Sequence, residues 1–401
     1  MRGVTSDEQA VLERLADAPM LAQVESWASV NSGSRNLDGL ERMAGLLADA
    51  FAALPGQLAL RDAARVDEMG ASALETVAHG RNLHLKVRPD APVQLLFTGH
   101  MDTVYGADHP FREVAWREQG VLGGPGVADM KGGLAVMLAA LKAVEAVGAP
   151  AFGYEVVINS DEEVGSPGSA ALLAEAARGK HAALTYEPAA LPDGTLAGAR
   201  PGSGNFSIQI LGKSAHAGRN PEDGRNAIVA AADLALRLAK AKGPRLSVNP
   251  ARIDGGGPNN VVPDRAILRV NMRPFTLEDQ ERATAHLDAA VAMVVAEHGV
   301  EVRIHGGFGR PPKPLDAKAE KLFALVQSCG ADLGQAFGWQ PSGGVCDGNN
   351  IAACGVPVVD TMGVRGGAIH SDREYLIVDS LVERARLSAL TILRLATGDA
   401  L

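Results

Sequence analysis

The chain has few cysteines, no excess of basic residues and no long uninterrupted apolar segment. Its three cysteines, Cys329, Cys346 and Cys354, lack the spacing of a zinc-finger module, so we interpret them as free thiols in a reducing compartment. The formal net charge is −9 and no basic stripe with interleaved aromatic residues is present, which argues against nucleic-acid binding. No apolar run could cross a membrane, and the first residues lack the apolar core of a signal peptide. These absences predict a soluble cytoplasmic protein.

The first half of the chain alternates between two hydrophobic patterns. The 401 residues are 46% hydrophobic, enough for a sizeable core, and their number predicts about two domains. Strand-like apolar runs occur at 82–87, 93–99, 154–159 and 181–186, and helical patterns follow residues 129 and 169. This alternation predicts an α/β fold with a mixed, mostly parallel sheet flanked by helices.

The pattern changes near residue 202. Predicted strands and helices then follow in β-α-β-β-α-β order, which is typical of a ferredoxin-like α+β domain. A proline-rich stretch at 310–314 leads back to α/β character. We therefore predict that residues 1–200 and 313–401 form one domain, into which residues 201–312 are inserted as a lid.

Side chains that bind metals follow several of the predicted strands. In chain order they are His100, Asp102, Asp129, Asp161, Glu162, Glu163, Glu187 and His370. They should converge, because sites in open α/β sheets form outside the carboxyl ends of the strands. Imidazoles and carboxylates suit zinc, with cobalt or manganese as substitutes, and this set exceeds the need of one ion. The sequence therefore predicts two metal ions that share a bridging carboxylate.

Six segments carry a family resemblance, in one order through most of the chain. They are Gly99-His100-Met101-Asp102-Thr103-Val104, Gly126-Val127-Ala128-Asp129-Met130-Lys131-Gly132-Gly133, Asp161-Glu162-Glu163-Val164-Gly165-Ser166, Ser214-Ala215-His216-Ala217-Gly218, Asn260-Val261-Val262-Pro263 and Gly367-Ala368-Ile369-His370-Ser371. Together they resemble the aminoacylase / glutamate carboxypeptidase / acetylornithine deacetylase family of co-catalytic di-zinc hydrolases. The resemblance implies a zinc-exopeptidase-like sheet with a dimerising lid.

The resemblance also implies roles for the residues at the strand ends. Asp129 would bridge two Zn²⁺ ions, His100 and Glu187 would complete one site, and Glu163 and His370 would complete the other. Glu162 would be the general base that takes a proton from the attacking water and passes it to the leaving amine. Asp102 would orient His100.

Residues of the lid and of the last segment would bind the substrate. His216 resembles the histidine that reaches the partner subunit's site and stabilises the oxyanion, which implies a homodimer through the lid. Asn260 and Arg273 resemble lid residues that hold the substrate carboxylate, and Gly344 would add a backbone amide there. We add the hypothesis that Arg365, which shortly precedes His370 in the sequence, contributes to substrate recognition.

Several of these residues also have a plain structural interpretation. Each metal-ligand candidate, taken singly, fits an ordinary surface position, and only the ordered set at strand ends favours metal binding. Asp161 is interpreted as a cap of the turn that follows it, and Asp347, which lies near the predicted site, also fits a cap of the helix that follows it. Arg273 fits a lid salt bridge as well as a carboxylate clamp. Cys346 has no histidine nearby in the sequence, which disfavours a nucleophile.

These residues predict a hydrolase that cleaves an amide bond next to a free carboxylate. The substrate is a small peptide or an N-acyl amino acid. The stretch 342–370 looks closer to glutamate carboxypeptidases, whereas Glu187 favours deacylases and deacetylases, because this position is often Asp in the peptidases. Both alternatives stay open here. A non-catalytic metal-binding member would not need Glu162, and an aminopeptidase would not need Arg273.

Overall fold

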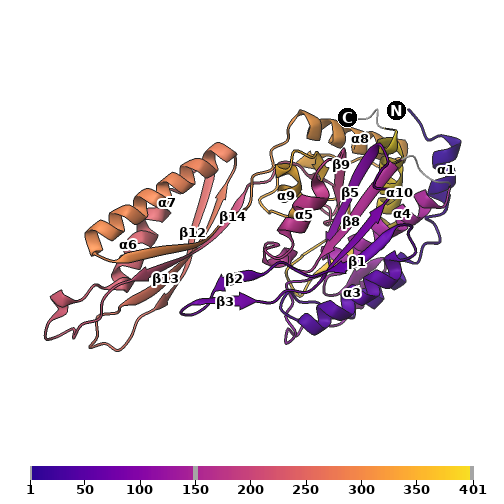
Figure 1. The fold of residues 1–401 in the computed structure, drawn as a ribbon. Coiled ribbons are helices and arrows are strands. Elements are labelled where there is room, and N and C mark those ends of the chain that lie inside the picture. The colour runs from indigo at the N-terminus through magenta and orange to yellow at the C-terminus, as the bar shows by residue number, and fades with distance from the viewer. Residues whose placement is uncertain (1, 148–151, 398–401) are drawn as a thin grey trace.

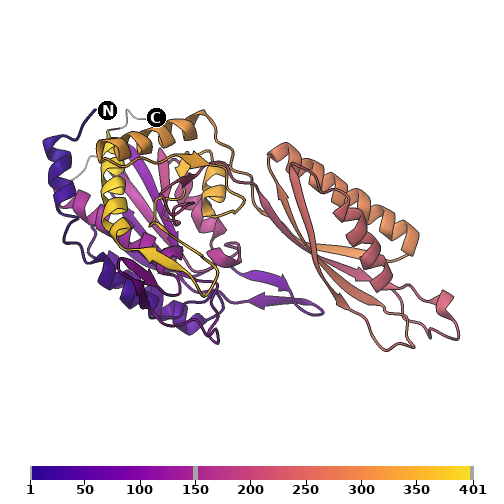
Figure 2. The same cartoon turned by 180° about the vertical axis from the view of Figure 1, so that it is seen from behind.

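The computed structural model describes residues 2–147 and 152–397, which form two bodies joined by two short connections. The larger body holds both ends of the described chain, and the smaller body, the lid, extends to one side (Figures 1 and 2). Among the described residues, no helix combines the length and apolarity needed to cross a membrane.

A six-stranded mixed sheet forms the centre of the larger body. Its strand order is β1-β4-β8-β5-β9-β16, in which β8, β5, β9 and β16 are parallel. At one edge β4 pairs antiparallel with β8, and β1 pairs antiparallel with β4. The strands are β1 (Gln57–Arg61), β4 (Asn82–Val87), β5 (Val93–His100), β8 (Phe152–Asn159), β9 (Ala182–Thr185) and β16 (Val358–Val359). The predicted α/β class is confirmed.

Helices cover both faces of this sheet. The main core joins inward side chains of α1 to α4, α8 and α10 to one sheet face, and a smaller core joins α5 and α9 to the other. The helices are α1 (Ser6–Glu13), α2 (Met20–Ala28), α3 (Leu37–Phe51), α4 (Gly133–Glu145), α5 (Ala170–Ala177), α8 (Ala317–Asp332), α9 (Asp347–Ala353) and α10 (Asp379–Ala396). Because both faces are buried, β5 and β8 are nearly continuous apolar runs.

The lid is the predicted ferredoxin-like unit, with two helices on one face of a four-stranded antiparallel sheet. Its sheet order is β12-β13-β11-β14. The elements are β11 (Ser203–Leu211), α6 (Ala227–Ala239), β12 (Leu246–Gly255), β13 (Arg265–Pro274), α7 (Leu277–His298) and β14 (Glu301–Arg310). Phe206, Ile208 and Ile210 alternate along β11 and pack under the helices, which leaves the other sheet face open. These bounds lie just inside our proposed limits, 201–312.

Several short strands lie outside the two main sheets. A two-stranded hairpin of β2 (Val66–Met69) and β3 (Leu74–Val77) leaves the larger body between β1 and β4 and extends toward the lid (Figure 1). A small sheet of order β17-β18-β7-β6 supports the last segment of the chain. Its strands are β6 (Ala115–Glu118), β7 (Val121–Gly123), β17 (Gly366–Gly367) and β18 (Tyr375–Ile377), and a further pair joins β10 (Leu196–Ala197) to β15 (Trp339–Gln340).

The structure differs from the sequence-based expectation at two places near the strand ends. The helix expected from Asp129 begins only at Gly133, because Asp129 and Met130 have non-helical dihedral angles in the turn Val127–Gly132. The apolar run at 356–362 is typical of a longer strand, but only the two residues of β16 have strand geometry. Beyond it, the backbone amides of Met362 and Gly363 still donate to Thr185 and Glu187, but without regular strand geometry.

Candidate metal centre and active site

The predicted ligands come together at the carboxyl edge of the central sheet. His100 is the last residue of β5, and Glu187 follows β9 by two residues. Glu162 and Glu163 begin the short turn Glu162–Val164 after β8. Parallel strands end at the same edge, so these side chains meet although they lie far apart in the sequence.

Two loops bring the remaining candidates to this edge. Asp129 lies in the irregular turn before α4, and its side chain is 6% exposed. His370 lies between β17 and β18 and has a φ of 61°, a conformation that non-glycine residues rarely adopt. Such backbone conformations often occur at functional sites, where the surrounding structure enforces them.

The carboxylate of Asp129 faces both histidines. Its Oδ1 lies 3.2 Å from His100 Nε2, and its Oδ2 lies 3.2 Å from His370 Nε2. Glu187 Oε2 is 3.8 Å from His100 Nε2, and Glu163 Oε2 is 3.2 Å from His370 Nε2. The structure thus has two groups of three side chains, and Asp129 belongs to both.

The spacing of these atoms fits a metal centre. Tetrahedral zinc with bonds of about 2.0–2.2 Å holds neighbouring donor atoms roughly 3.3–3.6 Å apart. The observed separations of 3.2–3.8 Å are close to this range. In addition, the buried Glu187 Oε1 accepts no hydrogen bond from the described residues, although a buried carboxylate oxygen normally has a partner. A bound cation would supply one.

The charges around the histidines have a clear electrostatic consequence. Burial by itself would lower the pKa of His100, but Asp102, Asp129 and Glu187 overcome this effect and raise its pKa well above the usual range. Burial would likewise raise the pKa of Asp129, yet hydrogen bonds from His100 and His370 lower it. Carboxylates therefore outnumber the cations here, which is the environment that a divalent metal ion requires.

Asp102 connects two of the ligand-bearing segments. Its backbone oxygen lies 3.0 Å from His100 Nδ1, and its Oδ1 lies 3.3 Å from the same atom. Its carboxylate also accepts hydrogen bonds from the backbone amides of Glu162 and Glu163, each at 3.1 Å, and from Ser34 Oγ at 2.7 Å. Asp102 therefore touches His100 as expected, and it holds the turn that carries Glu162 as well.

Glu374 has a similar position that the sequence did not reveal. Its carboxylate is buried and accepts hydrogen bonds from the backbone amides of Gly126, Ala128 and Asp129 at 3.0–3.1 Å, and from Tyr105 Oη at 2.8 Å. It follows His370 by four residues, so one loop carries a predicted ligand and also holds the turn of Asp129. The one feature of the sequence that could have pointed to Glu374 is its short distance from His370.

Glu162 lies beside the ligand groups and is paired with a buried arginine. Its Oε1 is 2.7 Å from Arg310 Nη2, in an ion pair that lacks hydrogen-bond alignment. Burial raises the pKa of Glu162 to about 7, and Arg310 opposes this rise. A carboxylate with a pKa near neutrality can both accept and donate a proton, as a general base must. The sequence did not single out Arg310.

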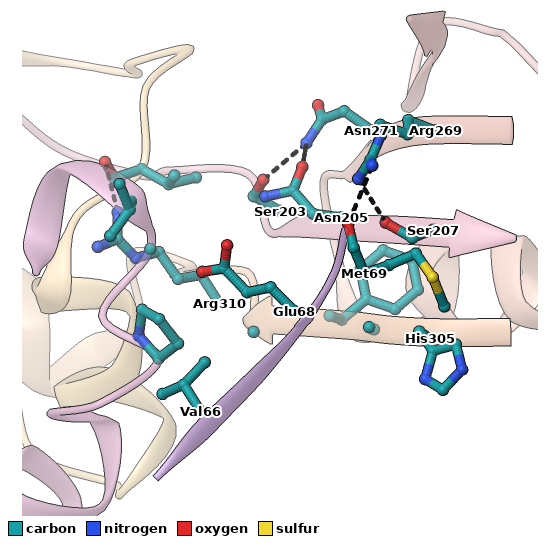
Figure 3. A pocket seen from close by; sticks show the side chains of 18 of the residues that line it. Val66, Glu68, Met69, Ser203, Asn205, Ser207, Arg269, Asn271, His305 and Arg310 are labelled. Carbon is teal, nitrogen blue, oxygen red and sulfur yellow. Dashed lines mark hydrogen bonds between the residues drawn. The ribbon is translucent and has the colours of Figure 1, made fainter. Parts of the chain in front are cut away.

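A cleft of about 960 Å³ separates this centre from the open face of the lid sheet. Glu162, Glu163 and Arg310 border it, and so do lid residues such as Asn205, Asn271 and Arg273. Figure 3 shows Arg310 on one side of this cleft and Asn205, Ser207, Arg269 and Asn271 along the lid strands. The cleft can therefore hold a substrate between the metal ligands and the lid.

Arg273 is the expected lid residue that reaches this cleft. Its Nε donates to Asn271 Oδ1 at 3.1 Å and its Nη1 donates to the Gly343 carbonyl at 2.9 Å. Among the described residues, no carboxylate lies within ion-pair distance of it. The alternative of a lid salt bridge is therefore not observed. Gly344, next to Gly343, donates its amide to Ser342 Oγ at 3.2 Å.

His216 and Asn260 lie together, but at the other end of the lid. The amide of Ala217 donates to the Asn260 carbonyl, and His216 pairs with Val261 in an isolated bridge. These loops lie beyond the end of β11 that is distant from the cleft, and nine strand residues separate the two ends, about 26 Å. Within one chain, the structure does not bring His216 and Asn260 to the metal ligands.

The remaining candidates have structural partners. Arg365 donates to Glu383 at 2.9 Å and to the Pro192 carbonyl at 2.8 Å, so its guanidinium is directed away from the cleft, and the hypothesis of substrate recognition gains no support. Asp161 accepts from the Gly168 amide at 2.6 Å and from Ser169 Oγ, as a turn cap does. Asp347 begins α9 and accepts from Asn159 Nδ2 at 2.8 Å.

The chain is similar to known proteins in both sequence and fold. Residues 96–394 match a family model described as peptidase family M20/M25/M40. The chain is 34% identical over 335 residues to carboxypeptidase G2 of Pseudomonas sp. (strain RS-16), covering 80% of this chain and 78% of that protein. It is 29% identical over 330 residues to succinyl-diaminopimelate desuccinylase of Ectopseudomonas mendocina, covering 75% and 82%. The solved structure of aminopeptidase PepT from Bacillus cereus superposes with a TM-score of 0.71 at 25% identity, covering 96% and 99%.

Proposed function

The chain belongs to peptidase family M20/M25/M40 and is a hydrolase, and from this premise we propose that it cleaves an amide bond next to a free carboxylate at a centre of two Zn²⁺ ions. The observation that carries the proposal is Asp129, whose two oxygens each face a different histidine, with a carboxylate beside each histidine. Such ions would polarise the scissile carbonyl and lower the pKa of water. Co²⁺ or Mn²⁺ would fit the same donors.

The protein's own residues would carry out the proton transfers. Glu162 accepts a proton from the attacking water while the water oxygen bonds to the carbonyl carbon. Glu162 then donates this proton to the amine nitrogen as the C–N bond breaks, which gives a carboxylic acid and an amino acid with a free amine. Its pKa of about 7 suits both steps. Arg310 keeps the carboxylate directed into the cleft.

Arg273 would bind the substrate carboxylate. Its guanidinium borders the cleft and has no carboxylate partner among the described residues, so a substrate carboxylate would complete its charge pairing. Recognition of the carboxylate by Arg273 distinguishes the proposed enzyme from an aminopeptidase, whose site must bind a free α-amine instead. Substrates whose carboxylate is converted to an amide should lose most of their kcat/KM, and Arg273→Ala should lose the preference for the acid.

The decisive experiment is a hydrolysis panel with zinc-loaded protein. It compares N-acetyl, N-formyl and N-succinyl amino acids, folate-like acylglutamates and dipeptides. Hydrolysis of one class with a free carboxylate supports the proposal, and failure on every class would overturn it. The panel also separates a glutamate-carboxypeptidase-like enzyme, which the 34% identity to carboxypeptidase G2 favours, from an N-acyl amino acid deacylase, which the desuccinylase likeness favours.

The distance between His216 and the cleft of its own chain supports a homodimer through the lid. If His216 and Asn260 serve a site, that site belongs to another copy, because about 26 Å of strand lies between them and their own cleft. Analytical ultracentrifugation should show a dimer. A mixture of His216→Ala and Glu162→Gln subunits should regain activity through mixed dimers, whereas a fully active monomer would contradict the proposal. A cytoplasmic location also stays a prediction.

A further inference from the structure

The β2–β3 hairpin lies between the two bodies. It pairs only with itself among the described strands and reaches from the larger body to the open face of the lid sheet (Figures 1 and 2). Met69, at the end of β2, is only 7% exposed although a two-stranded hairpin has no core of its own. Its burial therefore comes from the surroundings into which the hairpin extends.

The tip of the hairpin is hydrogen-bonded to the lid. Arg269 Nη2 donates to the carbonyls of Met69 and Gly70 at 2.9 and 3.0 Å. Arg265 Nη1 and Gln209 Nε2 donate to the carbonyl of Ser72 at 2.8 and 3.3 Å. Four bonds thus join the tip to β11 and β13.

Three arginines of β13 show how the hairpin divides the lid face. Arg265, Arg269 and Arg273 are four residues apart, so they project from the same face of the strand. The first two bind the hairpin tip, whereas Arg273 borders the cleft. The hairpin therefore covers the outer half of the open face and leaves the inner half facing the metal ligands.

The base of the hairpin is attached to the catalytic loop. The amide of Ala64 donates to the carbonyl of Gly168, at 2.8 Å, in the segment that follows Glu162 and Glu163. Farther along, Glu68 pairs with Arg35 at 2.6 Å. Arg35 directly follows Ser34, whose hydroxyl binds the Asp102 carboxylate. The hairpin is thus anchored to the active-site loops as well as to the lid.

We propose that the β2–β3 hairpin and the inner half of the open lid face form a subsite for the acyl part of the substrate. The proposal rests on the function given above, in which Arg273 holds the carboxylate and the scissile carbonyl lies beside Glu162. A substrate bound in this way extends its acyl group away from Arg273, along the lid face toward the hairpin. Val66, Glu68 and Met69 then form the end wall of the cleft (Figure 3).

The side chains of this subsite select an acyl group that forms hydrogen bonds. Asn249, Asn271 and Asn205 lie in register across β12, β13 and β11, and all three border the cleft. Asn271 Nδ2 donates to Asn205 Oδ1 at 2.8 Å and to Ser203 Oγ at 3.1 Å, which holds the row in place. A purely apolar acyl group would cover these amides without replacing their bonds to water.

The size of the cleft agrees with an acyl group longer than acetyl. Its volume of about 960 Å³ is near the upper end of the usual range for small-molecule sites, about 300–1,000 Å³. An N-acetyl amino acid would occupy only the part next to Arg273 and Glu162. An acyl group of two further amide units would reach the hairpin.

Three substrates with one common C-terminal amino acid test the proposal. The N-acetyl group is too short to reach the hairpin. The N-acetylglycylglycyl and N-octanoyl groups are both long enough and have the same length, but only the first contains amide groups. Zinc-loaded protein should prefer the acetylglycylglycyl substrate over the octanoyl substrate by at least about tenfold in kcat/KM, because each amide gains hydrogen bonds in the subsite.

Two variants remove the hairpin's contribution. In one, residues 68–75 are replaced by two glycines, and in the other Arg269→Ala releases the tip from the lid. Both should abolish most of the acetylglycylglycyl preference and leave kcat/KM for the acetyl substrate within about threefold. Arg303→Ala is the matched control, because this lid arginine pairs with Glu301 and does not touch the hairpin. Metal content and thermal melting should match the parent protein.

The outcomes separate the subsite from the proposed function. If the parent protein hydrolyses none of these substrates or those of the panel, the proposed function fails. If it hydrolyses them but the hairpin variants change all three rates by one common factor, the hairpin only holds the lid and the subsite is overturned. No difference between the long substrates in the parent protein would overturn it too.

Discussion

Glu374 Oε1 accepts a 3.0 Å hydrogen bond from the backbone amide of Asp129, the residue that faces both histidines. The same oxygen accepts from the Ala128 amide, so the orientation of the turn depends on a carboxylate outside the predicted ligand set. Groups that orient metal ligands typically change metal affinity by 10–100-fold when they are mutated.

We therefore expect Glu374→Gln to weaken zinc binding by about 10–100-fold, because an amide nitrogen replaces one oxygen that the backbone amides require. Competition with a chromogenic chelator measures this affinity without any turnover. Glu145→Gln is the control, since Glu145 is also a poorly exposed carboxylate but pairs with Arg88. Equal zinc affinity in the two variants would show that the Glu374 contacts are dispensable.

Neighbouring Glu162 and Glu163 should give opposite results when each is changed to glutamine. Glu162→Gln should retain zinc and lose about 10²–10⁴-fold in kcat, because only the proton acceptor is removed. Glu163→Gln should lose metal, since Glu163 Oε2 is one of the donors beside His370, at 3.2 Å. Elemental analysis combined with kcat distinguishes them. A Glu162→Gln enzyme with near-normal kcat would contradict the assignment of the base.

Metal binding should release protons at neutral pH. Hydrogen bonds that His370 donates to the carboxylates of Asp129 and Glu163 raise its pKa to about 11, and the pKa of His100 is raised as well. These shifts favour the protonated form of both imidazoles in the metal-free protein, and a histidine must lose its proton to become a metal ligand. Calorimetric titration in two buffers of different ionisation enthalpy should detect a net release of protons, with affinity falling as the pH falls. Identical heats in both buffers would exclude this coupling.

The buried ion pairs of Asp360 with Arg200 and Lys313 should make the stability of the fold depend on pH. Burial would raise the pKa of Asp360, but Arg200 and Lys313, at 2.7 and 2.8 Å, lower it to about 2. The folded-state pKa is below the unfolded value, so this stabilisation is complete above about pH 4 and is lost as the pH falls toward 2.

Asp360→Asn should therefore destabilise the protein by about 3–5 kcal/mol at pH 7, because two buried cations lose their partner. Urea unfolding monitored by circular dichroism measures the difference, which should shrink at pH 3. Asp233→Asn is the control, since Asp233 and Arg237 form a partly exposed pair, and the change should cost about 0–1 kcal/mol. A difference that is equally large at both pH values would contradict the role of the Asp360 charge.

The order of helices and strands could be predicted from the sequence because it depends on the hydrophobic periodicity of each short segment. The lid elements, the apolar strand before His100 and the acidic run after β8 all follow from periodicity and strand ends, and the predicted ligands do lie together. The hairpin was missed because its residues 66–77 alternate weakly and pack against the lid, not against the chain near them. When residues are buried by a part of the chain that is distant in sequence, their own segment need not show a regular hydrophobic pattern.

The sequence by itself determined which residue types could bind metal and in what order the chain presents them, because ligands at strand ends are a local property. Only the tertiary structure decided which residues support them. Glu374 and Arg310 reach the centre through contacts across 245 and 148 positions of the chain, and no spacing rule predicts such pairs. The tertiary structure likewise separates His216 from the cleft and brings the hairpin to it. The positions of His216 and of the hairpin depend on how the lid packs against the larger body, and this packing is determined by side chains of both bodies together.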